Sequence, residues 1–118
     1  MYVDGFLLPL PTKNVKAYTK LAKLACKVWM DHGALGYHEC LLDDGVAKMG
    51  KSLQELAQPK KGETVVFAWI VFKNRKHRDS VNAKVMKDKR FDGMADKPLP
   101  FDCSRIGYAG FKEIVSSD

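Results

Sequence analysis

Residues 63–72 read Glu-Thr-Val-Val-Phe-Ala-Trp-Ile-Val-Phe, a run of β-branched and aromatic residues without a polar break. Such a run predicts a β-strand that is buried on both faces. Because successive side chains of a strand point to opposite sides, one apolar face consists of Val65, Phe67, Trp69 and Val71, and the other of Val66, Ala68, Ile70 and Phe72. Both faces therefore need a cover that excludes water.

The composition predicts one folded domain that spans residues 1–118. With 46% hydrophobic residues, the chain can bury a modest core without disulfide bonds. Cys26, Cys40 and Cys103 are far apart and have no Cys-x-x-Cys spacing, so we expect reduced, buried thiols. No stretch has the length and apolar character of a membrane span, and we expect a cytoplasmic protein without a membrane partner.

Further elements are predicted on both sides of the central strand. They are strands at 2–8, 34–42 and 104–115, helices at about 12–31 and 74–88, and a short helix at 51–58. Pro9 and Pro11 are expected to end the first strand. Thr12 and Asn74 are expected to cap the two long helices.

The order strand, helix, strand, strand, helix, strand decides the architecture. Two right-handed crossovers place the first and third strands in the centre of the sheet. We therefore predict an α+β fold, a ferredoxin-like βαββαβ antiparallel sheet with both long helices on one face. The chain has no second layer for the other face. A second copy packed sheet to sheet would supply it, so we expect a homodimer that forms a dimeric α+β barrel.

Several blocks of the sequence resemble the YbaA-like bacterial domains of unknown function. The blocks are residues 2–6, 32–35 with Glu39 and Cys40, 64–67 with Trp69 and Ile70, Arg78 with Asp79, Asn82, Lys84 and Met86, and 100–102 with Arg105, Gly110 and Phe111. The resemblance covers nearly the whole chain and implies a dimeric α+β barrel of ferredoxin-like subunits. It implies no reaction. Residues 48–56 depart from the family pattern, so no role of that loop carries over.

Polar residues that the patterns carry towards the interior are candidate catalytic residues. They are Asp4, Glu39, His77, Arg78 and Asn82. Burial would raise the pKa of Asp4 or Glu39 and fit either for general acid or base work. Arg78 could pair with such a carboxylate or with an anionic substrate. One hypothesis is a pocket between sheet and helices that binds or converts a small molecule; the other is that Asp4 and Arg78 form a structural ion pair.

Metal and cofactor sites are not predicted. His38 and Cys40 share a strand face, and His32 or His77 could join them, but the spacing matches no known ligand motif. The chain also lacks a glycine-rich phosphate loop in a strand-to-helix context. We expect neither a metal nor a nucleotide or other cofactor.

A stripe of lysines marks the first long helix. It consists of Lys13, Lys16, Lys20, Lys23 and Lys27, with no acidic residue between them, in a chain of net charge +6. The stripe extends over about 21 Å at 1.5 Å per residue and could follow the phosphates of RNA. The alternative is a solvated helix face, because amphipathic helices usually carry lysine outward. Three functions stay open: a small-molecule pocket, RNA binding, and a structural or regulatory dimer without catalysis.

Overall fold

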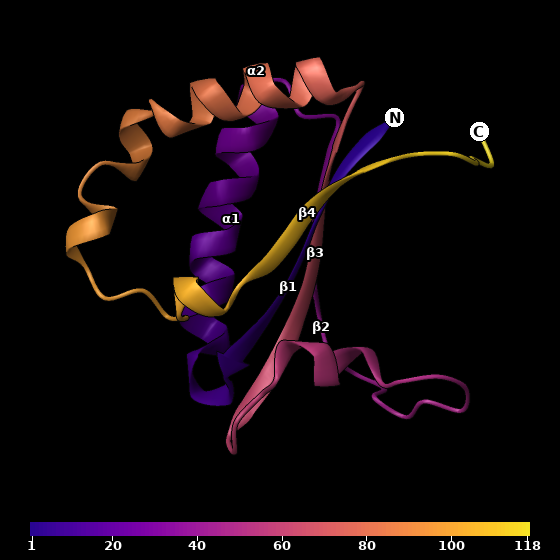
Figure 1. The fold of residues 1–118 in the computed structure, drawn as a ribbon. Helices are drawn as coiled ribbons and strands as arrows, with labels where there is room; N and C mark the ends of the chain where they lie inside the picture. The colour runs from indigo at the N-terminus through magenta and orange to yellow at the C-terminus, as the bar shows by residue number, and fades with distance from the viewer.

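The computed structural model describes residues 1–118, apart from the side chain of Ala95. Its main elements are β1 (Tyr2–Pro11), α1 (Val15–Asp31), β2 (Gly36–Leu41), β3 (Glu63–Phe72), α2 (Arg75–Met86) and β4 (Gly107–Lys112). The strands form one antiparallel sheet in the order β2-β3-β1-β4 (Figure 1). This confirms the α+β class, the ferredoxin-like strand order and the bounds of the 63–72 strand.

Both helices lie on the same side of the sheet (Figure 1). The helix side of β3 is buried and joins two apolar clusters. In the first, Ile70 and Phe72 pack with residues of both helices, among them Val28 and Val81. In the second, Val66 and Ala68 of β3 pack with Leu8 and Leu10 of β1. In the described part of the chain, no helix is long and apolar enough to span a membrane.

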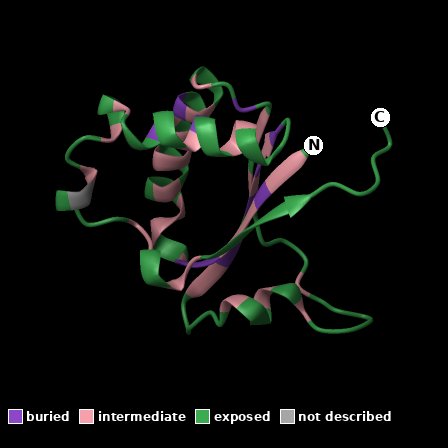
Figure 2. Cartoon of the chain, turned by 45° about the horizontal axis from the view of Figure 1, so that its top comes forward, coloured by how far each residue is buried: buried purple, intermediate pink, exposed green. Residues whose placement is uncertain are grey.

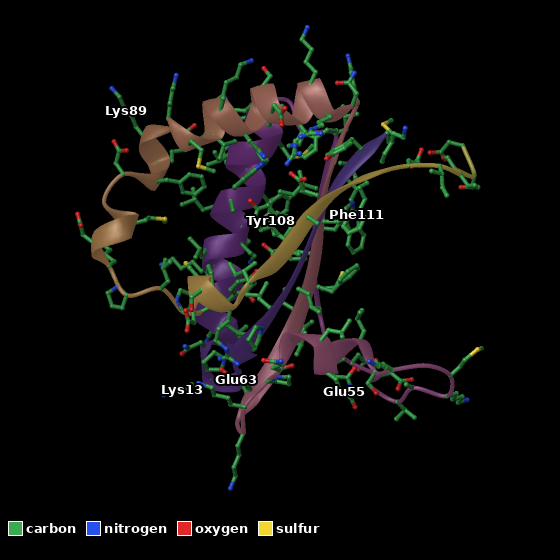
Figure 3. All side chains as sticks on the ribbon, in the orientation of Figure 1. Lys13, Glu55, Glu63, Lys89, Tyr108 and Phe111 are labelled. Carbon is green, nitrogen blue, oxygen red and sulfur yellow. The ribbon has the colours of Figure 1, made fainter. Side chains whose placement is uncertain are left out.

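The opposite side of the sheet has little cover. Phe67 in the middle of β3 is 44% exposed and Phe111 of β4 is 60% exposed. Figure 3 shows Tyr108 and Phe111 on β4, and the alternation of the strand puts them on opposite faces. Only Val65 is buried on this face of β3, next to Leu53 of the short 3-10 helix Leu53–Ala57. The helices thus cover one face only, as predicted, and every residue of β4 is exposed (Figure 2).

The prediction that prolines end β1 is wrong, because the strand continues to Pro11. Only residues from Tyr2 to Leu7 of β1 pair with β4, so Pro9 lies beyond the end of that neighbour. On its other side Pro9 faces Val65, whose carbonyl accepts a hydrogen bond from Leu42 N–H at 2.9 Å, away from β1. The proline nitrogen therefore points away from β3, and its missing N–H costs no ladder bond.

The two helix starts differ from each other. Asn74 caps α2 as predicted, because its side chain accepts a hydrogen bond from His77 N–H at 2.8 Å. Thr12 does not cap α1. It begins a 3-10 turn, Thr12–Asn14, and the helix follows at Val15. The Asn14 amide donates instead to the Pro100 carbonyl at 2.8 Å, which fastens the 91–102 segment to the start of α1.

An ion pair fastens the entry of β4 to the start of β3. Arg105 donates to both carboxylate oxygens of Glu63, at 2.8 and 2.9 Å, and also to the Gln58 carbonyl at 3.0 Å. The Arg105 hydrogen bonds, with a second contribution from Lys60 N–H, hold the pKa of Glu63 at about 2, below its usual 4.5. A depressed carboxyl pKa stabilises the fold above the unfolded-state pKa, and this contribution disappears as the pH falls.

Glu63→Gln should therefore lower the free energy of unfolding at neutral pH, and the difference from the wild type should shrink between about pH 5 and pH 2. Urea unfolding followed by circular dichroism at a series of pH values measures it. Glu55→Gln is the matched control, because Glu55 is exposed on the 3-10 helix (Figure 3). A loss of stability that is the same at every pH would contradict this role of the ion pair.

Candidate functional site

A half-enclosed cavity of about 160 Å³ lies between α1 and the sheet. The sheet, α1 and the segment before β4 all contribute to its walls, which are Phe6, Leu8, Tyr18, Leu21, Ala22, Ala25, Trp29, Tyr37, Glu39, Ala68, Ile70, Phe101 and Ile106. Ala22 and Ala25 of α1 face this space together with Ala68 of β3. Three methyl groups fill less volume than the larger side chains around them, which explains why helix and sheet leave room here.

The strand register explains which polar group reaches the cavity. Glu39 of β2, Ala68 of β3 and Phe6 of β1 are paired in one row across the sheet. Because Ala68 is small, the Glu39 side chain borders an open space and not a packed neighbour. Glu39 is the one charged side chain among the described residues that line the cavity.

Two phenols hold the Glu39 carboxylate. Tyr18 from α1 donates to Oε1, and Tyr37 from β2 donates to Oε2 at 2.7 Å. Burial raises the pKa of both phenols, and their hydrogen bonds to Glu39 raise it further, so both remain protonated donors. Each carboxylate oxygen can accept one more hydrogen bond. The site can therefore receive a donor or a cation from a ligand.

Tyr18 borders both this cavity and a second one. The second cavity has a volume of about 130 Å³, and its walls also include Tyr18, Ala22 and Glu39. The Tyr18 ring meets the Phe101 ring edge to face, with centroids 5.6 Å apart. Phe101 thus supports a side chain that borders both cavities.

Asp4, Arg78 and Asn82 form a separate cluster. The Asp4 residue is only 2% exposed, and its Oδ1 lies 3.2 Å from Arg78 Nη1 without hydrogen-bond alignment. Arg78 also donates to the Tyr2 hydroxyl at 3.0 Å. Burial raises the pKa of Asp4, although Arg78 and a hydrogen bond from Asn82 oppose the shift. The arrangement is that of a buried ion pair between β1 and α2.

The structure brings together three of the five predicted residues and sets the other two apart. Glu39 lines the cavity, two strands away from Asp4. Trp29 connects the two places, because its ring lines the cavity and its Nε1 donates to Asn82 Oδ1 at 3.0 Å. His77 lies at the start of α2, where its Nδ1 accepts a hydrogen bond from Lys73 N–H at 3.0 Å.

Sequence reasoning missed Tyr18, Tyr37 and Phe101 as site residues. One signal was present: Tyr37 and Glu39 are two residues apart on a strand, so they share a face and can hydrogen-bond each other.

The remaining candidates lie outside the cavity. The lysine stripe is exposed along α1 and the turn before it, and Lys27 pairs with Asp31 at 3.7 Å. His38 stacks on Trp69 on the uncovered sheet face, whereas His32 contacts Asp88 at 2.6 Å. The expectation of buried thiols is wrong for Cys40, on that same uncovered face, and for Cys103, in a 3-10 turn; both are exposed.

Arg78→Met should reduce the free energy of unfolding by about 3 kcal/mol, because it leaves the Asp4 carboxylate buried without its partner. Adding Asp4→Asn should recover much of that loss, since the unpaired charge is then gone. The loss should also shrink as the pH falls and Asp4 takes up a proton. A urea-unfolding double-mutant cycle measures both effects. Simply additive losses would show that the two side chains do not act as a pair.

Comparison with known proteins agrees with the resemblance seen in the sequence. Residues 1–103 match the family model described as "Protein of unknown function (DUF1428)". The chain is 32% identical over 114 residues to "Uncharacterized protein YbaA" of Escherichia coli K12, covering 97% of both chains. The YbaA proteins of Escherichia coli O157:H7 and Shigella flexneri give the same identity and coverage. These descriptions state neither a ligand nor a reaction.

Proposed function

Since the chain belongs to the DUF1428 family of YbaA-like proteins, we propose that it is a small-molecule binding protein whose ligand occupies the cavity between α1 and the sheet. One observation carries the proposal: a carboxylate, Glu39, borders an otherwise apolar cavity and is hydrogen-bonded by two neutral phenols. Ligand sites commonly combine apolar walls with a few convergent polar groups.

The volume of the cavity limits the size of the ligand. At about 160 Å³ it resembles in size the engineered cavities of about 150 Å³ that bind benzene. The ligand is therefore of the size of one aromatic ring or a short branched chain, with one polar group for Glu39. The second cavity, which shares Tyr18, Ala22 and Glu39 with the first, has room for a substituent of the ligand.

Filling the cavity should weaken binding. Ala25→Leu adds three carbons to the wall, so we expect affinity for one-ring alcohols and amines to fall at least about tenfold, measured by isothermal titration calorimetry. Ala17→Leu is the matched control, because Ala17 is exposed on the same helix. If both variants bind as the wild type does, the ligand site lies elsewhere.

The proposal includes a homodimer. Support comes from the uncovered sheet face, where Phe67 and Phe111 border a shallow apolar hollow with Leu7 and Ala109. A contiguous apolar surface of this kind is typical of an interface. A two-fold axis would set this face against the same face of a second copy, at the usual spacing of about 10 Å between packed sheets.

Phe67→Lys should therefore give a monomer, because two lysines would be buried near the two-fold axis. Light scattering after size-exclusion chromatography gives the mass in solution. Met86→Lys, at the exposed end of α2, should leave the dimer intact. A wild-type protein that is monomeric at micromolar concentration contradicts the proposal.

The lysine stripe supports a second candidate, RNA binding. Among the ion pairs of the described residues, Lys27 is the member of the lysine stripe that has a partner. Most of the positive charge of the stripe is therefore uncompensated. Affinity for RNA would fall steeply with salt, whereas ligand binding in the apolar cavity would not. A third candidate, a structural or regulatory dimer without catalysis, follows if neither kind of ligand binds.

A further inference from the structure

Aromatic rings form much of the wall around Glu39. Five rings line the cavity, those of Phe6, Tyr18, Trp29, Tyr37 and Phe101. The faces of such rings carry partial negative charge and attract cations within about 6 Å of the ring centre. Tyr18 and Phe101 meet at 79° and Trp29 and Tyr37 at 44°, so neither pair is stacked in parallel, whereas one face of Phe6 is stacked on Tyr108 at 17°.

The described residues around the cavity carry no positive charge that would balance Glu39. The chain has a net charge of +6, yet no lysine or arginine is among the described residues that line the cavity. Glu39 also takes part in none of the ion pairs between described residues. Its hydrogen-bond donors are the neutral hydroxyls of Tyr18 and Tyr37. A partly buried carboxylate is stabilised far better by a cation than by neutral donors alone.

We infer that the ligand is an organic cation, an alkyl- or arylammonium ion, held in this aromatic cage with Glu39 as its counter-charge. The inference rests on the proposed function, since it specifies the ligand class of the same cavity. Anionic ligands are disfavoured by the Glu39 carboxylate, and neutral ligands gain only a hydrogen bond from it. Aromatic rings and one carboxylate suit an ammonium group whose carbon substituents fill the rest of the space.

Two pairs of compounds with matched shapes test the inference. Choline is compared with 3,3-dimethylbutan-1-ol, which replaces the quaternary nitrogen by carbon, and benzylamine is compared with benzyl alcohol. We expect each cation to bind at least about tenfold more tightly than its neutral counterpart, as measured by calorimetry. Equal binding within both pairs overturns the inference and leaves the proposed cavity function standing. If none of the four compounds binds, the proposed function fails as well.

Variants show whether the preference comes from this site. Glu39→Gln keeps the size of the side chain and should lower the ratio of cation to neutral affinity, leaving the part of the preference that the rings contribute. Tyr37→Phe keeps the ring and should preserve the preference, whereas Tyr37→Leu removes the ring face and should weaken it. The selectivity ratio is the readout, because a merely destabilised variant would lose affinity for both members of a pair. An unchanged ratio in a folded Glu39→Gln variant overturns the assignment of Glu39.

Discussion

The structure depends on one constraint: β3 is apolar on both faces, and the helices of one chain cover only one of them. On the helix side, Ile70 and Phe72 are buried against residues of α1 and α2. On the other side Phe67 is substantially exposed. The helix layer therefore determines where a cavity can exist, and the uncovered face determines where a second copy would pack. Both parts of the proposed function follow from this division.

The cavity arises where the side chains of the helix layer become small. Ala22 and Ala25 lie over Ala68, and the missing volume is bordered by Glu39 on the neighbouring strand. β2 is an edge strand, so a carboxylate there keeps access to solvent while its two oxygens are fixed by phenols from different elements. The site is thus anionic, and five of its wall residues are aromatic.

The sequence predicted the fold better than it predicted the site. The 63–72 run, the order of elements and the Asn74 cap each depend on local patterns, and all three are confirmed. The prediction that Pro9 ends the first strand was wrong, because the place of Pro9 in β1 depends on where β4 ends. That is a property of the tertiary structure. The strand order likewise places Glu39 two strands away from Asp4, although both side chains face the helices. Phe101 reaches the cavity from an irregular segment, where no periodicity marks the direction of a side chain.

The claim that most needs a direct test is that the ligand lies between α1 and the sheet. Isotope-filtered nuclear Overhauser spectroscopy on labelled protein with unlabelled benzylamine identifies the protons next to the bound molecule. A ligand in the cavity gives cross-peaks to the rings of Tyr18, Tyr37 and Phe101. Cross-peaks confined to Phe67 and Phe111, on the uncovered sheet face, would contradict it.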